Sequence, residues 1–116
     1  MQVLKQDQLP WSEIAHELVG AEHGLDITLL FVDAKPGRGP ALHRHPYSEV
    51  FIVQAGEATF TIEGEQHELS AGDIVIAHAN QAHAFVNSGT GPLRQIDIHL
   101  SSSFITEWLQ EQQNTT

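Results

Sequence analysis

The sequence predicts an all-β fold of the sandwich or barrel type. Six segments rich in Val, Ile, Phe and Thr alternate with a period of two, as strands do when one face is buried. They are residues 25–32, 50–53, 58–62, 73–77, 83–86 and 93–100. Turn signals rich in glycine, proline and serine separate these segments at intervals of about eight to fifteen residues, which is the spacing expected of such folds.

The two ends of the chain depart from this pattern. The apolar residues within 104–109 recur with helical spacing behind a run of three serines that can supply an N-cap. We therefore predict a short C-terminal helix. Near the N-terminus, residues 11–18 fit either a short helix or an irregular arm that ends in a strand.

Size, charge and cysteine content narrow the class of protein. A chain of 116 residues predicts one domain, residues 1–116, with one hydrophobic core. Its formal charge of −10 repels phosphates and anionic lipids, so no nucleic-acid or membrane partner is expected. The absence of cysteine excludes disulfides, thiolate zinc sites and cysteine nucleophiles. No apolar run of signal-peptide length begins the chain, so a cytoplasmic protein is expected.

A set of candidate metal ligands lies within residues 43–83. His43 and His45 stand two positions apart, so on a strand they share one face while Arg44 points the other way. Glu49 can add an oxygen ligand, and His83 can close the set. Three imidazoles and one carboxylate suit a first-row divalent metal better than calcium or magnesium, which prefer oxygen. We predict one Fe, Mn, Ni, Cu or Zn ion per chain, and we assign no catalytic residue.

The spacing of these ligands resembles the first motif of the cupin superfamily, G-x5-H-x-H-x(3,4)-E-x6-G. In this chain the motif covers residues 37–56 without a gap, from Gly37 to Gly56. Two histidines, one glutamate and both flanking glycines occupy the expected positions, so the match is specific.

A second cupin motif, G-x5-P-x-G-x2-H-x3-N, is matched in part over residues 72–87. Gly72, His83 and Asn87 occur at the correct spacing, whereas His78 replaces the proline and Asn80 replaces the glycine. Asparagine tolerates a left-handed backbone better than most residues, so Asn80 can preserve the turn. We expect His78 to face solvent at this turn rather than to bind the metal.

The chain resembles the small single-domain cupins of bacteria and archaea. The resemblance implies an antiparallel jelly-roll barrel of six to eight strands that holds one metal near its mouth, and it implies a homodimer. Separately, apolar residues occupy both faces of residues 50–53, which is more apolar strand surface than one core needs. We therefore expect a second copy of the chain to cover part of it.

The predicted ligand set leaves one or two metal positions open for a small-molecule substrate. By resemblance to cupin dioxygenases, we favour a dioxygenase of an enediol, catechol, flavonol or β-diketone. The alternatives are a zinc- or manganese-dependent isomerase, a hydrolase, and a cupin that binds a sugar or organic acid without catalysis. An isomerase or hydrolase needs a further acid or base, and besides Glu49 only His99 and Tyr47 offer one.

The last predicted strand has two different faces. One face carries Gln95, Asp97 and His99, and the other carries Arg94, Ile96, Ile98 and Leu100. We predict that the aliphatic face turns inward and the polar face meets water, as in most antiparallel sheets. The opposite arrangement would bring Gln95 and His99 to the ligand. Three further histidines, expected to face solvent, are His16, His23 and His67.

Overall fold

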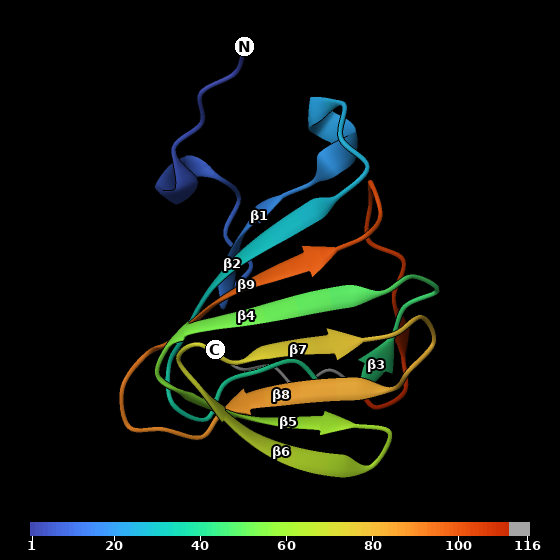
Figure 1. The fold of residues 1–116 in the computed structure, drawn as a ribbon. Coiled ribbons are helices and arrows are strands. Elements are labelled where there is room, and N and C mark those ends of the chain that lie inside the picture. The colour runs from blue at the N-terminus through green and yellow to red at the C-terminus, as the bar shows by residue number, and fades with distance from the viewer. Residues whose placement is uncertain (112–116) are drawn as a thin grey trace.

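The computed structural model describes residues 1–111 as two five-stranded antiparallel sheets that face each other (Figure 1). The first sheet has the order β1 (Ala15–Leu18), β2 (Thr28–Ala34), β9 (Leu93–His99), β4 (Glu49–Ala55) and β7 (Ile74–Ala77). The second has the order β10 (Glu107–Trp108), β3 (His43–Arg44), β8 (His83–Asn87), β5 (Glu57–Ile62) and β6 (Glu65–Ser70). The all-β prediction is confirmed, but the two sheets do not join into a closed barrel.

Two short 3₁₀ helices, η1 (Gln6–Gln8) and η2 (Gly20–His23), precede and follow β1. Of the two readings left open for residues 11–18, the irregular arm that ends in a strand is the one observed. The polar strand β6 was not predicted, because it lies at a sheet edge and most of its side chains are exposed on both faces. Within residues 1–111, no helix is long and apolar enough to cross a membrane.

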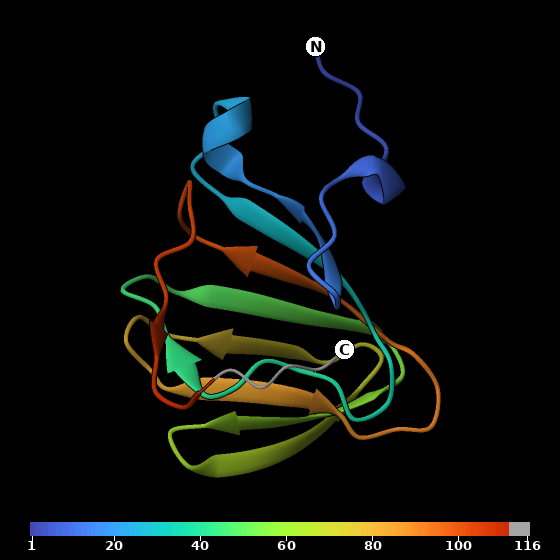
Figure 2. The same cartoon turned by 180° about the vertical axis from the view of Figure 1, so that it is seen from behind.

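The predicted C-terminal helix is wrong. Residues 104–106 are irregular, and Glu107 and Trp108 form β10, which pairs antiparallel with β3. Seen from behind, this segment runs beside β3 at one end of the molecule (Figure 2). The helical spacing of the apolar residues is overridden because the edge of β3 offers backbone partners and the apolar side chains have a cavity to line.

Aromatic rings fill the space between the sheets. Phe51 from the first sheet meets Phe60 of the second at a ring-centroid distance of 5.0 Å, and Phe60 stacks on Phe85 at 5.2 Å. All three are at least 95 % buried. Burial of rings of this size supplies a large part of the hydrophobic stabilisation of so small a domain.

Several turns of the two motifs take left-handed backbone angles, among them those at Gly56 and Asn80. Gly56 has φ 87°, and a Cβ there would lie 2.4 Å from the carbonyl oxygen of Pro92, so only glycine fits. Asn80 has φ 68°, as its expected role in the turn requires. Its backbone N–H donates to the carbonyl oxygen of His45 at 2.7 Å, so this turn holds a candidate ligand in place. His78 is exposed there, as expected.

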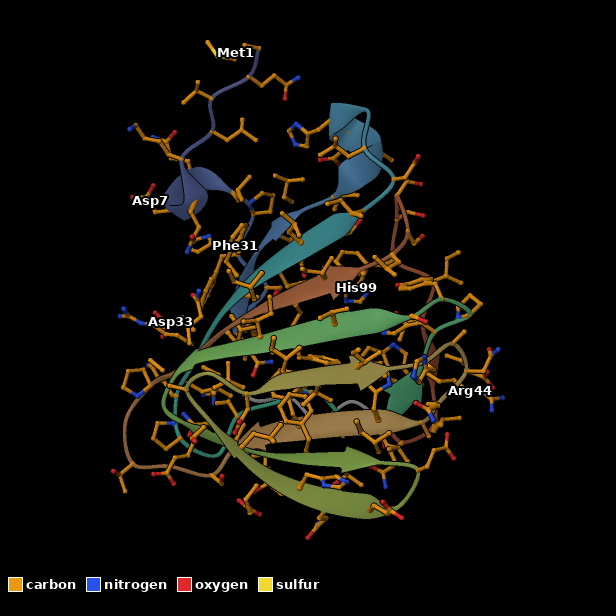
Figure 3. The ribbon with its side chains drawn as sticks, viewed as in Figure 1. Met1, Asp7, Phe31, Asp33, Arg44 and His99 are labelled. Carbon is orange, nitrogen blue, oxygen red and sulfur yellow. The ribbon has the colours of Figure 1, made fainter. Side chains whose placement is uncertain are left out.

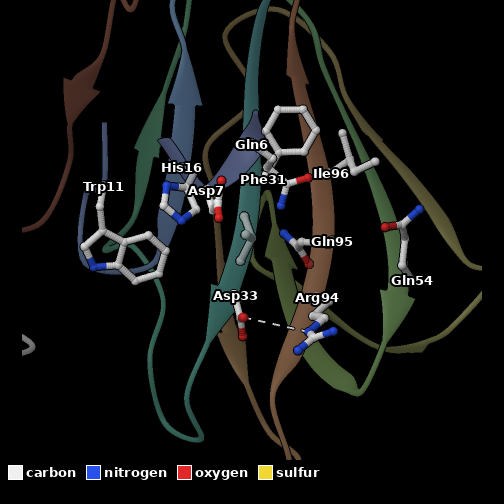
Figure 4. A pocket seen from close by; sticks show the side chains of 11 residues that line it. Gln6, Asp7, Trp11, His16, Phe31, Asp33, Gln54, Arg94, Gln95 and Ile96 are labelled. Atoms are coloured by element: carbon white, nitrogen blue, oxygen red, sulfur yellow. Dashed lines mark ion pairs between the residues drawn. The ribbon is translucent and has the colours of Figure 1, made fainter. Parts of the chain in front are cut away.

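The outer face of the first sheet is apolar. The strand register aligns two rows of apolar side chains across β2, β9, β4 and β7. One row is Leu29, Ile98, Val50 and Ile76, and the other is Phe31, Ile96, Ile52 and Ile74. At one side of the face, the N-terminal arm and Phe31 border a cavity of about 540 Å³, next to the ion pair of Asp33 and Arg94 (Figure 4).

We expect this apolar face to be covered by a second copy of the chain. Its two rows carry no charged side chain, so two chains of charge −10 can meet there with little repulsion. Four strands of apolar surface also suit the roughly 1,000 Å² that a stable interface buries. Sedimentation at micromolar concentration is expected to give twice the 12.8 kDa chain mass.

Substitutions on β7 test this interface. Ile74 and Ile76 are 63 % and 52 % exposed, so replacing both with lysine is expected to give monomers that remain folded. Val86→Lys, on the outer face of β8 in the other sheet, is the matched control and should leave the dimer intact. A wild-type protein that sediments at 12.8 kDa would contradict the prediction.

Candidate metal centre

Strand register brings the predicted ligands to one end of the space between the sheets. In the first sheet, Glu49 of β4 lies directly opposite His99 of β9, whose position at the end of its strand is seen in Figure 3. In the second sheet, His43 of β3 lies opposite His83 of β8. His45 follows β3 immediately and points to the same side as His43, because the two are separated by one residue.

The four predicted ligands converge. One ligand atom from each of His43, His45, Glu49 and His83 lies within 4.8 Å of the others, and all four residues are buried. Within residues 1–111 no other group of three or more His, Asp or Glu side chains converges in this way. Arg44 points away from the group and pairs with Glu107 at 2.7 Å, as the alternation predicts (Figure 3).

Hydrogen bonds fix which nitrogen of each imidazole is free. The Nδ1 atoms of His43, His45 and His83 lie 2.7–2.9 Å from the carbonyl oxygens of Ala41, Ile105 and Gln81 respectively. A carbonyl oxygen only accepts, so each Nδ1 carries the proton. In the neutral rings, the three Nε2 atoms therefore present lone pairs to the centre, which is the form that binds metal.

The carboxylate of Glu49 faces these lone pairs. Its Oε1 lies 3.2 Å from Nε2 of His45 and 3.3 Å from Nε2 of His83. Nε2 of His45 is fully buried and makes no hydrogen bond within the described residues. A carboxylate oxygen and unprotonated nitrogens do not satisfy one another, whereas a divalent cation between them would satisfy all of them. The residues present therefore fit a metal ion.

The electrostatics of the group suit the same ion. Burial lowers the pKa of His43 to about 4, and the neighbouring His83 and His45 add to this effect, so the ring is neutral at pH 7. Burial opposes ionisation of Glu49, but hydrogen bonding to the surrounding imidazoles, in which Nε2–H of His99 is the donor, holds the pKa of the carboxyl well below its ordinary value. Neutral imidazoles and an ionised carboxylate are the states that metal binding requires.

The lowered pKa of His43 predicts how the stability of the metal-free protein varies with pH. Between its ordinary value of 6.5 and its native value of about 4, the unfolded chain binds a proton at this residue and the native chain does not. Stability should therefore fall as pH falls through this window, by up to about 3 kcal/mol from this residue.

Urea unfolding of the metal-free wild type and of His43→Gln at several pH values between 7 and 4 measures this contribution. The free energy of unfolding of the wild type minus that of His43→Gln should decrease as pH falls, because only the wild type takes up a proton at this position on unfolding. An equal pH dependence in both would contradict the prediction. Affinity for metal should also decrease below pH of about 6, since imidazole ligands must lose their protons to bind.

The predicted orientation of the last strand is wrong. Gln95, Asp97 and His99 face the space between the sheets and are 1–4 % exposed, whereas the aliphatic Ile96 and Ile98 face outward. The alternation of polar and aliphatic residues does not indicate which face is inward. Here the inner face carries the polar site and the outer face belongs to the apolar rows described above. Of the inward residues, Asp97 and His99 line the cavity and Gln95 lies deeper.

His99 holds the carboxylate rather than completing the predicted ligand set. Its Nε2 lies 3.0 Å from Oε2 of Glu49, and its Nδ1 lies 2.7 Å from the hydroxyl of Tyr47. The carboxylate oxygen only accepts, so Nε2 of the neutral His99 ring carries the proton and the Tyr47 hydroxyl donates to Nδ1. Nε2–H of His99 then donates to Oε2, which leaves Oε1 to face the three free nitrogens.

Asp97 is a second buried carboxyl near the centre. Burial, reinforced by the negative charge of Glu49, raises its pKa well above the ordinary value, although Gln95 donates a hydrogen bond to it at 2.8 Å. Burial therefore favours the protonated form of Asp97 in the metal-free protein. Sequence reasoning placed this residue on a face in water, and only the strand register assigns it to the site.

A cavity of about 340 Å³ opens onto the centre, a volume that suits a small organic molecule. Its walls combine metal-site residues with apolar side chains from both sheets and from the C-terminal segment. The apolar lining includes Ile14, Leu30, Phe51, Phe85, Phe104 and Trp108. Of the three histidines expected to face solvent, His67 is exposed, whereas His16 and His23 are half-buried, and none of them lines this cavity.

The family profile of the cupin domain matches residues 30–99, which is more than half of the chain and includes every residue of the centre. The chain belongs to the cupin domain family. The residues that identify it as a cupin are the ones that converge in the structure, so the family assignment and the site geometry agree.

Solved structures share the fold of this cupin. An uncharacterized conserved protein with a double-stranded β-helix domain from Klebsiella pneumoniae subsp. pneumoniae MGH 78578 matches with a TM-score of 0.75 and 24 % identity, covering 96 % of this chain and 99 % of that one. Oxalate decarboxylase of Bacillus subtilis, described with Mn(II) centres, matches with a TM-score of 0.74 and 24 % identity. The match covers 89 % of this chain but only 30 % of the decarboxylase.

A third structure, a candidate sugar phosphate isomerase from Acidithiobacillus ferrooxidans ATCC 23270, has a TM-score of 0.65 and 27 % identity. The match covers 75 % of this chain and 59 % of the isomerase chain. Because these structures carry different descriptions on one fold, fold similarity does not identify the activity of this cupin, and the chemistry of its own site must do so.

Proposed function

We propose that this cupin is a metal-dependent enzyme that acts on a small chelating molecule such as an enediol, catechol or β-diketone, with dioxygenase as the reaction class. The observation that carries the proposal is the convergence of three lone-pair nitrogens and one carboxylate oxygen beside an open cavity. A structural zinc site would instead be closed by four ligands with no adjoining cavity. His43, His45, Glu49 and His83 would hold the ion.

The bound ion would supply Lewis acidity and, if it is iron, manganese, nickel or copper, one-electron chemistry with dioxygen. The chain's own residues supply the rest. His99 and Tyr47 hold the carboxylate of Glu49 in one orientation. The apolar wall excludes water from the bound substrate, which strengthens electrostatic interactions inside the cavity. Manganese is among the proposed ions, and the described Mn(II) centres of the structurally similar decarboxylase support it.

An isomerase is a second candidate, and one observation favours it. Proton transfer between neighbouring carbons needs an acid or base near the substrate. Besides the predicted metal ligands and the partly exposed Glu17, two titratable side chains line the cavity. These are His99, whose Nε2–H points to the carboxylate of Glu49, and Asp97, whose protonated form is favoured because burial raises its pKa. This reaction needs no redox chemistry, so zinc would serve it as well as manganese.

Metal-depleted protein reloaded separately with Fe, Mn, Ni, Cu or Zn separates the candidates. A dioxygenase should consume oxygen with an enediol, catechol or diketone, and chelation should abolish the uptake. An isomerase should exchange substrate C–H hydrogen for deuterium in D₂O without consuming oxygen. Asp97→Asn should slow the exchange, whereas His67→Ala, an exposed histidine on β6, should not.

Ligand binding without either reaction would replace both proposals with non-catalytic binding. In that case a diketone or catechol should raise the melting temperature of the metal-loaded protein, because a ligand that binds only the native state stabilises it. The five metals must all be tested before this conclusion is drawn, since an inactive ion gives the same result as a binding protein.

A further inference from the structure

We infer that the cavity selects an uncharged, planar molecule that chelates through two oxygen atoms and releases one proton on binding, and that it discriminates against dicarboxylates and phosphates. The inference rests on the proposed function, because it names the substrate class for the same metal centre. Four features of the chain carry it: the positions of its basic residues, the carboxyl groups in the cavity, the charge balance at the centre and two aromatic rings of the cavity lining.

No lysine or arginine side chain lines the cavity. The chain has only five lysines and arginines, and none of them is part of the lining. Arg44 points outward, as its position in Figure 3 shows, and it is paired with Glu107. Arg94 lies on the outer face of the first sheet with Asp33 (Figure 4). An anionic substrate would therefore find no guanidinium or ammonium partner, which is the usual means of binding carboxylate or phosphate.

Carboxyl groups take the place of basic residues. Besides Glu49, the lining contains Asp97 deep in the cavity and Glu17 from β1. Asp97 is 2 % exposed, and burial favours its neutral form, so it offers an anion no cationic partner. Glu17 is partly exposed and carries the charge that would repel an anion. The lining therefore disfavours a dianion relative to a neutral molecule.

The charge at the centre is balanced by one further negative charge. A divalent ion with Glu49 as its only anionic ligand retains one positive charge. A neutral enediol, catechol or diketone that loses one proton on binding brings this charge to zero. A dicarboxylate would leave a net negative charge in a buried site with no partner, and a buried unpaired charge costs several kcal/mol.

Two aromatic rings of the C-terminal segment line the cavity and pack against opposite sheets. Phe104 packs against His99 of the first sheet at a ring-centroid distance of 5.1 Å, and Trp108 packs against His43 of the second at 5.0 Å. Both rings line the cavity and are 37 % and 48 % exposed, so each has surface available for a ligand. A planar conjugated molecule entering between them can stack on a ring while its oxygens reach the centre.

Binding to zinc-loaded protein tests the inference without turnover through dioxygen. The probes are 2,4-pentanedione, which is neutral, and malonate, a dianion with the same spacing between its oxygen-bearing carbons. Titration calorimetry gives the ratio of the dissociation constant of malonate to that of the diketone. This ratio should be at least about tenfold larger for the zinc-loaded protein than for free Zn²⁺. The heat of diketone binding should vary with buffer ionisation enthalpy in proportion to one proton released.

Variants identify the residues responsible. Glu17→Gln should reduce the preference for the diketone over malonate, whereas Glu22→Gln, the same charge change on the exposed η2, should not. Trp108→Ala should weaken catechol more than 2,4-pentanedione, because only catechol presents an aromatic ring. Far-UV circular dichroism and zinc content of each variant show whether fold and metal site are intact.

Malonate that binds as well as the diketone, after the free-zinc correction, would overturn the inference. A preference unchanged by Glu17→Gln in folded, zinc-loaded protein would overturn the role of the Glu17 carboxylate. These results are independent of the proposed reaction. If the protein prefers the diketone but shows neither oxygen uptake nor deuterium exchange, the proposed enzyme is rejected and the inferred selectivity stands. If it turns over a substrate but binds malonate more tightly than the diketone, the proposed enzyme stands and the inferred selectivity is rejected.

Discussion

Replacing both His43 and His45 with alanine is expected to reduce metal content from one ion per chain to a level below detection. The two substitutions remove two of the four converging ligand atoms, and the remaining pair, Glu49 and His83, does not form a high-affinity transition-metal site. Elemental analysis after metal depletion, reloading and dialysis measures the change. The wild type is expected to retain close to one equivalent.

The β-sheets should survive this double substitution. The core beneath the site is formed by Phe51, Phe60 and Phe85 together with aliphatic residues of both sheets, so the fold does not depend on the ion. Far-UV circular dichroism should match the wild type. A control that replaces the exposed His67 and His78 removes the same number of imidazoles and should keep full metal content. Undiminished metal in the His43, His45 variant would reject the ligand assignment.

Replacing His99 with alanine is expected to lower metal affinity by about 10- to 100-fold, although His99 is not one of the four ligands. Its Nε2–H holds Oε2 of Glu49 at 3.0 Å and so leaves Oε1 directed at the ion. Without this contact the carboxylate loses its fixed orientation and one buried hydrogen bond. Competition against a chelator of known affinity gives the change in the dissociation constant.

A graded pair of variants separates positioning from direct ligation. His99→Gln retains an N–H donor and should recover part of the affinity. Tyr47→Phe removes only the hydroxyl that fixes the His99 ring at 2.7 Å, so its effect should be smaller than that of His99→Ala. If His99→Ala abolishes metal binding as completely as the double histidine variant does, then His99 is a ligand and the positioning role is wrong.

The ligand cluster itself could be predicted because its signal is local in the sequence. His43 and His45 share a face by strand alternation, and the distances along the chain to Glu49 and His83 follow the cupin motifs. The left-handed turn at Asn80 was predictable for the same reason, since a single residue type indicates the backbone angle.

The C-terminal segment shows where local reasoning failed. Its apolar spacing predicts a helix, but Trp108 pairs through its backbone with His43, a residue 65 positions earlier in the chain (108 − 43). Ile105 accepts the Nδ1 proton of His45 across a similar separation. Long-range backbone pairing of this kind leaves no trace in a short sequence window, so the strand β10 and the rings that flank the cavity were not foreseeable.

By itself, the sequence determined the all-β class, the four candidate ligands and the family, because each depends on alternation, turn residues or fixed spacing. Only the tertiary structure decided which face of β9 lines the site. The inner face of that strand carries the polar centre, and its outer face carries Ile96 and Ile98 of the apolar rows, which reverses the usual arrangement of an apolar inner face and a polar outer face. The register that sets His99 opposite Glu49 resolves this ambiguity, and register is a property of paired strands rather than of either strand alone.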